Sequence, residues 1–166
     1  GIGSIKPAPV KKKVLIVGGG PAGLRAAEIA GQRGHNVTLY EKQDRLGGQV
    51  NIAALGAGRE EIAAIIRNEE NLLKLLPVEI VLNTELTAEL VLKQAPDVVI
   101  IATGAMPVEN PLPGSDGPHV FNVWQALTNE PAIGKRVLFV DNDGHHAGAA
   151  TAEFLLDHGH TVHMVT

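Results

Sequence analysis

Three glycines in the pattern Gly18-x-Gly20-x-x-Gly23 separate a short apolar run from an alanine-rich segment. In a phosphate-binding turn the first glycine permits the tight turn, the second lets a pyrophosphate approach the backbone, and the third lets a helix pack close to a strand. A helix beginning at Pro21 would direct free N–H groups and its positive dipole end at phosphates, and proline is tolerated there because its missing N–H is not needed. The pattern therefore predicts a site for the phosphates of a dinucleotide.

An acidic residue, Glu41, ends the next apolar run. A carboxylate at this place can accept hydrogen bonds from ribose hydroxyls, and it would repel a 2′-phosphate, so the site disfavours NADP. The competing interpretation is a glycine-rich turn that binds nothing, with Glu41 in solvent. We favour the binding site because the glycines, the helix and the acid lie in the register of one β-α-β unit.

The elements that position these residues follow from the apolar pattern. Strands are predicted at residues 14–17, 37–40, 78–82 and 97–102, and helices at residues 21–33, 60–76 and 87–93. Residues 45–58 are rich in glycine and are predicted to form a loop. Thr87 is expected to cap its helix. The fourth strand is apolar throughout, which is typical of a strand covered on both faces, and the strands are expected to be parallel.

A second strand–helix–strand pattern follows a proline-rich crossover. The crossover covers residues 107–118, a short helix is predicted at 121–129, and the pattern occupies residues 136–140, 147–157 and 161–165. Its first loop lies where a second nucleotide would bind, but the three-glycine spacing is absent there. Asp141 and Asp143 would oppose a pyrophosphate electrostatically. We therefore expect no NAD(P)H at this loop.

The same loop invites comparison with a metal site, because Asp141 and Asp143 are followed by His145 and His146 and both residue types bind metals. A closed site needs more convergent ligands than this short loop offers. We expect a polar turn, with Asp143 as a helix cap, and no metal site.

The composition excludes several classes of protein. The 166 residues include no cysteine, so the chain holds no disulfide, redox dithiol or cysteine-ligated iron–sulfur cluster, which fits the cytoplasm we expect as its location. No apolar run is long enough to span a membrane. The net charge is −4 and aromatic residues make up 3%, so we expect no nucleic-acid partner.

Three stretches carry a resemblance to a known family: residues 14–41, the sequence Arg45-Leu46-Gly47-Gly48-Gln49, and Ile101-Ala102-Thr103-Gly104. The chain resembles the C-terminal part of the trimethylamine dehydrogenase, 2,4-dienoyl-CoA reductase and N-demethylase group of NADH:flavin oxidoreductases. The resemblance implies an α/β fold, a Rossmann-like FAD/NAD(P)-binding domain with a central parallel sheet, followed by a partial second β-α-β unit. Residues 1–13 would be a linker, 14–106 the FAD-binding domain, 107–135 a crossover and 136–166 the start of a truncated second unit.

The resemblance also implies a cofactor and partners. FAD would bind through its ADP moiety, while FMN, a 4Fe-4S cluster and a barrel domain would lie elsewhere in a larger flavoprotein. No residue of this chain is expected to be catalytic. Three alternatives remain: a structural module that holds ADP, an NAD-binding domain, or an interaction domain without a ligand. The implied cofactor-binding residues are Gly18, Gly20, Pro21, Ala22, Gly23, Glu41, Lys42, Arg45, Gly47, Gly48, Gln49, Leu86, Ala102, Thr103 and Gly104.

Overall fold

The computed structural model describes residues 4–108, 112–129 and 132–166. The chain forms two compact units. Unit 1 comprises residues Gly1–Val50 and Ala63–Gly104, and unit 2 comprises Asn51–Ile62 and Ala105–Thr166.

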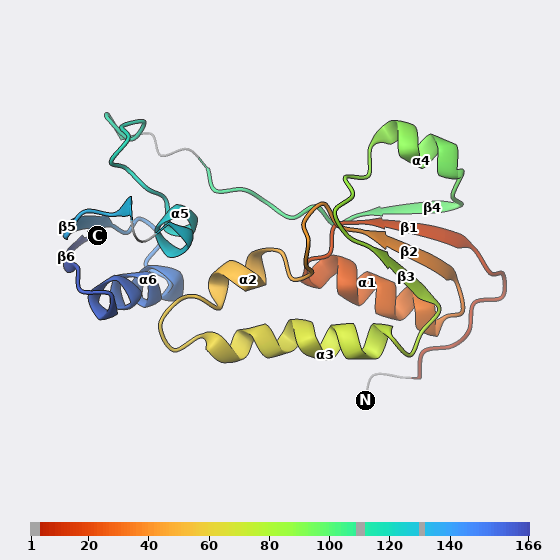
Figure 1. The fold of residues 1–166 in the computed structure, drawn as a ribbon. Coiled ribbons are helices and arrows are strands. Elements are labelled where there is room, and N and C mark those ends of the chain that lie inside the picture. The colour runs from red at the N-terminus through yellow and green to blue at the C-terminus, as the bar shows by residue number, and fades with distance from the viewer. Residues whose placement is uncertain (1–3, 109–111, 130–131) are drawn as a thin grey trace. The chain divides into compact units, whose positions relative to one another are not determined.

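Unit 1 is built on a four-stranded parallel sheet (Figure 1). Its strands lie in the order β3-β2-β1-β4, so the first strand along the chain is central. Val14 of β1 is paired with Val37 of β2 on one side and with Val98 of β4 on the other. The predicted central parallel sheet is thus confirmed. The bounds are Lys13–Val17 for β1, Asn36–Tyr40 for β2, Val78–Val81 for β3 and Val98–Ile101 for β4.

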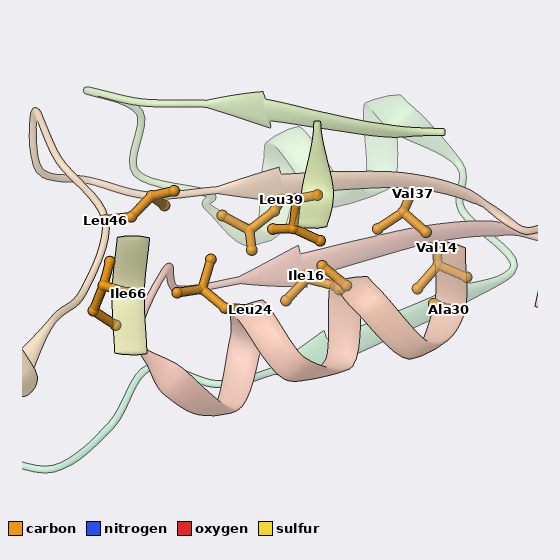
Figure 2. Packing of buried hydrophobic residues seen from close by; sticks show 10 residues of the cluster. Val14, Ile16, Leu24, Ala30, Val37, Leu39, Leu46 and Ile66 are labelled. Atoms are coloured by element: carbon orange, nitrogen blue, oxygen red, sulfur yellow. The ribbon is translucent and has the colours of Figure 1, made fainter. Parts of the chain in front are cut away.

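Helices α1 (Pro21–Gln32) and α3 (Ala63–Leu73) pack against each other on one face of this sheet, and α4 (Ala88–Gln94) lies on the other side (Figure 1). Thr87 caps α4 as predicted, because its side chain accepts a hydrogen bond from the N–H of Leu90. Strand side chains that point toward α1 interlock with its alanines and leucine to form the core (Figure 2). The buried members are Val14, Ile16, Leu24, Ala27, Ala30, Val37, Leu39, Leu46, Ile66 and Leu73.

Two expectations about α3 and β4 need correction. The helix expected over residues 60–76 begins as a 3-10 turn (Glu60–Ile62) and its α-helical part ends at Leu73, because the last turn before Pro77 tightens and a residue preceding proline disfavours the α region. Strand β4 is not covered on both faces among the described residues, since Ile101 is 76% exposed. Its alternate side chains point away from the face that α1 and α3 cover.

The expected loop at residues 45–58 contains a short helix, α2 (Gln49–Ala53), which corrects that prediction. A glycine-rich flank and five weakly patterned residues gave no helical signal, yet the N–H of Val50 already bonds to the Gly47 carbonyl at 3.1 Å. The turn therefore forms directly after the two glycines.

Unit 2 contains the predicted strand–helix–strand repeat. Strands β5 (Arg136–Val140) and β6 (Thr161–Val165) are parallel, and α6 (His146–Asp157) connects them and packs against β6. Helix α5 (Val123–Thr128) begins with a capping box between Asn122 and Gln125 that the sequence analysis did not note. The proline-rich crossover includes residues 109–111, which lie outside the described residues, and its described part contains no helix or strand.

Candidate dinucleotide-binding site

The first and third glycines of the loop are required by the chain itself. Gly18 has a positive φ of 106°, and a Cβ on it would lie 2.4 Å from the carbonyl oxygen of Ala102. Gly23 is the third residue of α1, where a Cβ would lie 1.9 Å from the carbonyl oxygen of Gly18. Both distances are far below van der Waals contact, so the close passage of helix, turn and strand depends on these two glycines.

The second glycine differs from the other two. Gly20 has φ −76° and ψ 180°, a conformation that any residue adopts. A Cβ on it would meet nothing within 4 Å in the described chain. Gly20 thus leaves open backbone at the amino end of α1, with no steric or conformational demand from its own neighbours.

The amino end of α1 is suited to an anion. The first intrahelical donor is the N–H of Leu24, which bonds to the Gly20 carbonyl at 3.0 Å, so the N–H groups of Ala22 and Gly23 precede the helical ladder. In the part of the chain that is described, no side chain caps this end and its first turn holds no acidic residue. The positive end of the dipole therefore meets the open surface beside Gly20.

Glu41 is buried, with 7% of its surface exposed, so the alternative of a solvated acid is wrong. Its Oε2 accepts a hydrogen bond from the N–H of Gly19 at 2.7 Å, and its Oε1 accepts one from the N–H of Gln43 at 2.8 Å. Among the described residues no cationic side chain pairs with it. Two backbone donors therefore fix the carboxylate, and each oxygen retains a lone pair for a further donor.

Gly19 is a site residue that the sequence analysis missed. Besides donating to Glu41, it accepts a hydrogen bond from the N–H of Gly47 at 2.8 Å, and a Cβ on it would lie 2.4 Å from Cδ2 of the buried Leu46. The sequence contained a hint to this role, because Gly19 is the middle residue of the run Gly18-Gly19-Gly20 and the dinucleotide-binding pattern does not require a glycine there.

The segment Arg45–Gln49 runs beside the glycine loop. Leu46 anchors it in the core, and Gly47 and Gly48 both have positive φ values. A Cβ on Gly48 would lie 3.3 Å from Cα of Gly20. Arg45 is exposed at the rim of this turn, as is Lys42 beside Glu41. The structure thus joins the two glycine segments that were predicted to share a ligand.

The exit of β4 completes the edge. The N–H of Ala102 continues the ladder to the Val17 carbonyl at 2.8 Å, and Thr103 and Gly104 follow on the surface. Gly104 has φ 77°, and a Cβ there would lie 3.3 Å from Nε2 of Gln49. All three segments therefore meet at the carboxyl ends of parallel strands, where ligands of open α/β sheets bind.

Leu86 is connected to the rest of the site less directly than the other predicted residues. The turn that leaves β3 is held to the end of β2, since Thr84 N–H bonds to the Glu41 carbonyl and Asn83 N–H to the Gln43 carbonyl, both at 2.9 Å. Leu86 is half-buried two residues beyond this turn, and within the described residues no backbone hydrogen bond links it to the glycine loop.

The second loop has a different structure. Helix α6 begins with His145 as its N-cap residue and without a side-chain cap, so the prediction that Asp143 caps it is wrong. Over the described residues, no three His, Cys, Asp or Glu side chains are grouped so as to hold a metal ion.

Fold and site together define an α/β dinucleotide-binding domain. Residues 12–137 match the family described as pyridine nucleotide-disulphide oxidoreductase. The chain belongs to this family, and it is a dinucleotide-binding domain of the kind found in flavin-dependent oxidoreductases.

Individual relatives agree with this assignment. The chain is 41% identical to a bilirubin reductase of Mediterraneibacter gnavus over 98% of its length, and 34% identical to a dimethylamine dehydrogenase of Hyphomicrobium sp. over 97%. It is similar in structure to a 2-naphthoyl-CoA reductase, with a TM-score of 0.89, 37% identity and 97% of the chain covered. The chain spans 25%, 24% and 24% of these three proteins, respectively. The resemblance to the amine dehydrogenase and N-demethylase group is confirmed.

No helix within the described ranges combines the length and apolar character that crossing a membrane requires.

Proposed function

We propose that unit 1 binds FAD through its ADP moiety. The observation that carries the proposal is Gly20, where the chain omits a side chain although neither its backbone angles nor its neighbours require this. A pyrophosphate lying against the backbone at this point supplies the missing reason.

The pyrophosphate would lie at the amino end of α1, where the N–H groups of Ala22 and Gly23 precede the helical ladder and the dipole favours negative charge. Gly47 and Gly48 would flank it from the adjacent turn, and the exposed guanidinium of Arg45 would offset phosphate charge. Pro21 supplies the first residue of this helix without adding an N–H.

The adenosine half would extend along β2. Glu41 would accept hydrogen bonds from the ribose hydroxyls, with its carboxylate held in place by Gly19 and Gln43. Leu86 would contact the adenine and Lys42 would lie at the rim. The other half of FAD would pass Ala102, Thr103 and Gly104, beside Gln49. When bound, FAD supplies the redox chemistry, and this chain supplies binding and orientation.

The proposal extends to the whole protein as a flavin-dependent oxidoreductase of the cytoplasm. Its relatives are about four times as long as this chain, which leaves room for a barrel domain with FMN and an iron–sulfur segment. Cysteine ligands for such a cluster would have to come from outside this chain, which has none.

The test is Gly20→Val in the protein that contains this chain. The substitution should abolish FAD binding without loss of folding, because valine tolerates this backbone conformation and its Cβ would have no atom of the described chain within 4 Å. Gly134→Val is the matched control, since Gly134 also has open space around its Cβ position and lies outside unit 1. FAD content after purification and the dissociation constant of FAD are the measurements.

Unchanged FAD binding by Gly20→Val would refute the proposed site. The nucleotide released by denaturing the parent protein should also be identified by its mass. FAD supports the proposal, whereas ADP alone would make unit 1 a structural nucleotide module. NAD would instead make unit 1 an NAD-binding domain.

A further inference from the structure

The strand-to-helix loops of the two units correspond in structure, although the second loop lacks the three-glycine pattern. Gly18 directly follows β1, and Asp141 directly follows β5. Gly23 and Gly148 are each the third residue of the helix that comes next. A Cβ on Gly23 would collide with the Gly18 carbonyl oxygen, and a Cβ on Gly148 would lie 2.7 Å from Oδ2 of Asp141. In both units a glycine at the third position of the helix lets the helix approach the residue that follows the strand.

The difference lies at the strand end. In unit 1 this position has no side chain, whereas in unit 2 it carries the carboxylate of Asp141. Its Oδ1 accepts hydrogen bonds from the N–H of Asp143 at 3.1 Å and from the N–H of Gly144 at 3.0 Å. Its Oδ2 lies against Gly148 in the first turn of α6. One carboxylate therefore accepts hydrogen bonds from two loop amides and also lies against the first turn of α6, where a phosphate would have to lie.

This terminus contains no competing group in the described chain. The N-cap residue of α6 makes no side-chain capping bond, and its first turn has no acidic residue. The Asp141 carboxylate is thus the anion that meets the positive end of a twelve-residue helix. Asp143 adds a second negative charge on the same exposed loop.

We propose that Asp141 is a built-in anion that fills the phosphate position of the second loop, so that unit 2 excludes the pyrophosphate of NADH and NADPH. Asp141 is then a specificity-determining residue. It restricts the protein to one dinucleotide site, in unit 1, although two Rossmann-type loops are present. The exclusion of NADH and NADPH is argued from unit 2 alone, whereas the statement that unit 1 holds the one dinucleotide rests on the proposed function.

The experiment measures binding of NADH and NADPH to the FAD-loaded whole protein by calorimetry, with amide hydrogen exchange across residues 141–148. The variants are Asp141→Gly, which reproduces the bare strand end of unit 1, and Asp141→Asn, which keeps an acceptor oxygen without the charge. Asp157→Asn, at the other end of α6, is the control. FAD content is recorded for each variant, so that a failure in unit 1 is seen separately.

The wild type should show no saturable binding at millimolar NADH or NADPH. In Asp141→Gly the amides of Asp143 and Gly144 should exchange faster. This variant should also bind NADPH saturably, with a dissociation constant at least about tenfold below the highest concentration at which the wild type shows no binding, since the substitution removes an opposing charge and frees the two loop amides. Asp141→Asn should fall between the two, and Asp157→Asn should match the wild type. The inference is overturned if wild-type protein binds either cofactor with protection of residues 141–148, or if Asp141→Gly gains neither faster exchange nor affinity.

Discussion

At the residue scale, the glycines of the first loop divide by what requires them. Gly18 and Gly23 are required by the polypeptide, because a Cβ on either would strike a backbone oxygen. Gly20 is required by nothing in the described chain. The sequence spacing identifies all three glycines. It does not show which of them the polypeptide requires and which one a ligand accounts for, because that depends on backbone angles and on neighbouring atoms.

Glu41 gives the residue-scale prediction. Replacing it with alanine should weaken FAD binding by about 1.5–3 kcal/mol, the range for hydrogen bonds to a charged group. The dissociation constant of FAD measures this, with the exposed acid Glu85→Ala as control. Because Gly19 and Gln43 donate to Glu41, the stability of the ligand-free variant is measured alongside to separate lost contacts from a disturbed loop. An unchanged dissociation constant removes Glu41 from the site.

At the element scale, the packed helices α1 and α3 each contribute a glutamate, and the two carboxyl groups influence each other. Glu28 of α1 is buried and is hydrogen-bonded by Gln32 at 2.8 Å and by Arg25. Glu69 of α3 has an Oε2 that is buried without a hydrogen-bond partner among the described residues. Burial first, and the nearby Glu28 carboxylate second, raise the pKa of Glu69 above its ordinary 4.5, against an opposing effect of Arg25.

The raised pKa makes stability depend on pH. The folded protein keeps the Glu69 proton at pH values where the unfolded chain has released it, so the folded state binds more protons than the unfolded one. The free energy of unfolding should therefore fall as pH rises from about 4.5 through the raised pKa of Glu69. Denaturant unfolding at a series of pH values measures this. Glu69→Gln should reduce the fall in the free energy of unfolding with pH, whereas Glu70→Gln, on the same helix, should leave this fall unchanged. An equal slope in wild type and Glu69→Gln would contradict the assignment.

Elements were predictable where one physical signal dominated. The strands were correct within one or two residues, because short β-rich apolar runs were bounded by glycine, proline or charge. The exposure of Ile101 was not predictable, since it depends on which face of the sheet a helix covers and not on the strand's own composition. Helix α2 was missed because five residues carry too little periodicity to outweigh the adjacent glycines. Convergence of the three site segments was predictable, because parallel strands direct their carboxyl ends to one edge.

At the scale of the whole molecule, all the proposed binding residues lie in unit 1, while the loop filled by Asp141 lies in unit 2. Sequence spacing indicated two related loops and correctly marked the second as departing from the glycine pattern. The spacing did not indicate that a carboxylate occupies the amides of the second loop, because Asp141 reaches these partners only through the longer turn that precedes α6.

This division predicts where FAD stabilises the protein. A ligand that binds only the folded state at a hundred times its dissociation constant adds about 2.7 kcal/mol to the free energy of unfolding. Because the proposed contacts are confined to unit 1, FAD should slow amide exchange in β1, β2 and the first turn of α1. The amides of β5 and β6 should exchange at the same rate with and without FAD. Hydrogen exchange of the apo and FAD-loaded protein checks both statements. Gly20→Val is the control, in which adding FAD should leave exchange unchanged in unit 1 as well. If FAD slowed exchange in β5 and β6 as much as in unit 1, the two units would unfold as one cooperative body. One nucleotide in unit 1 would then stabilise the entire chain.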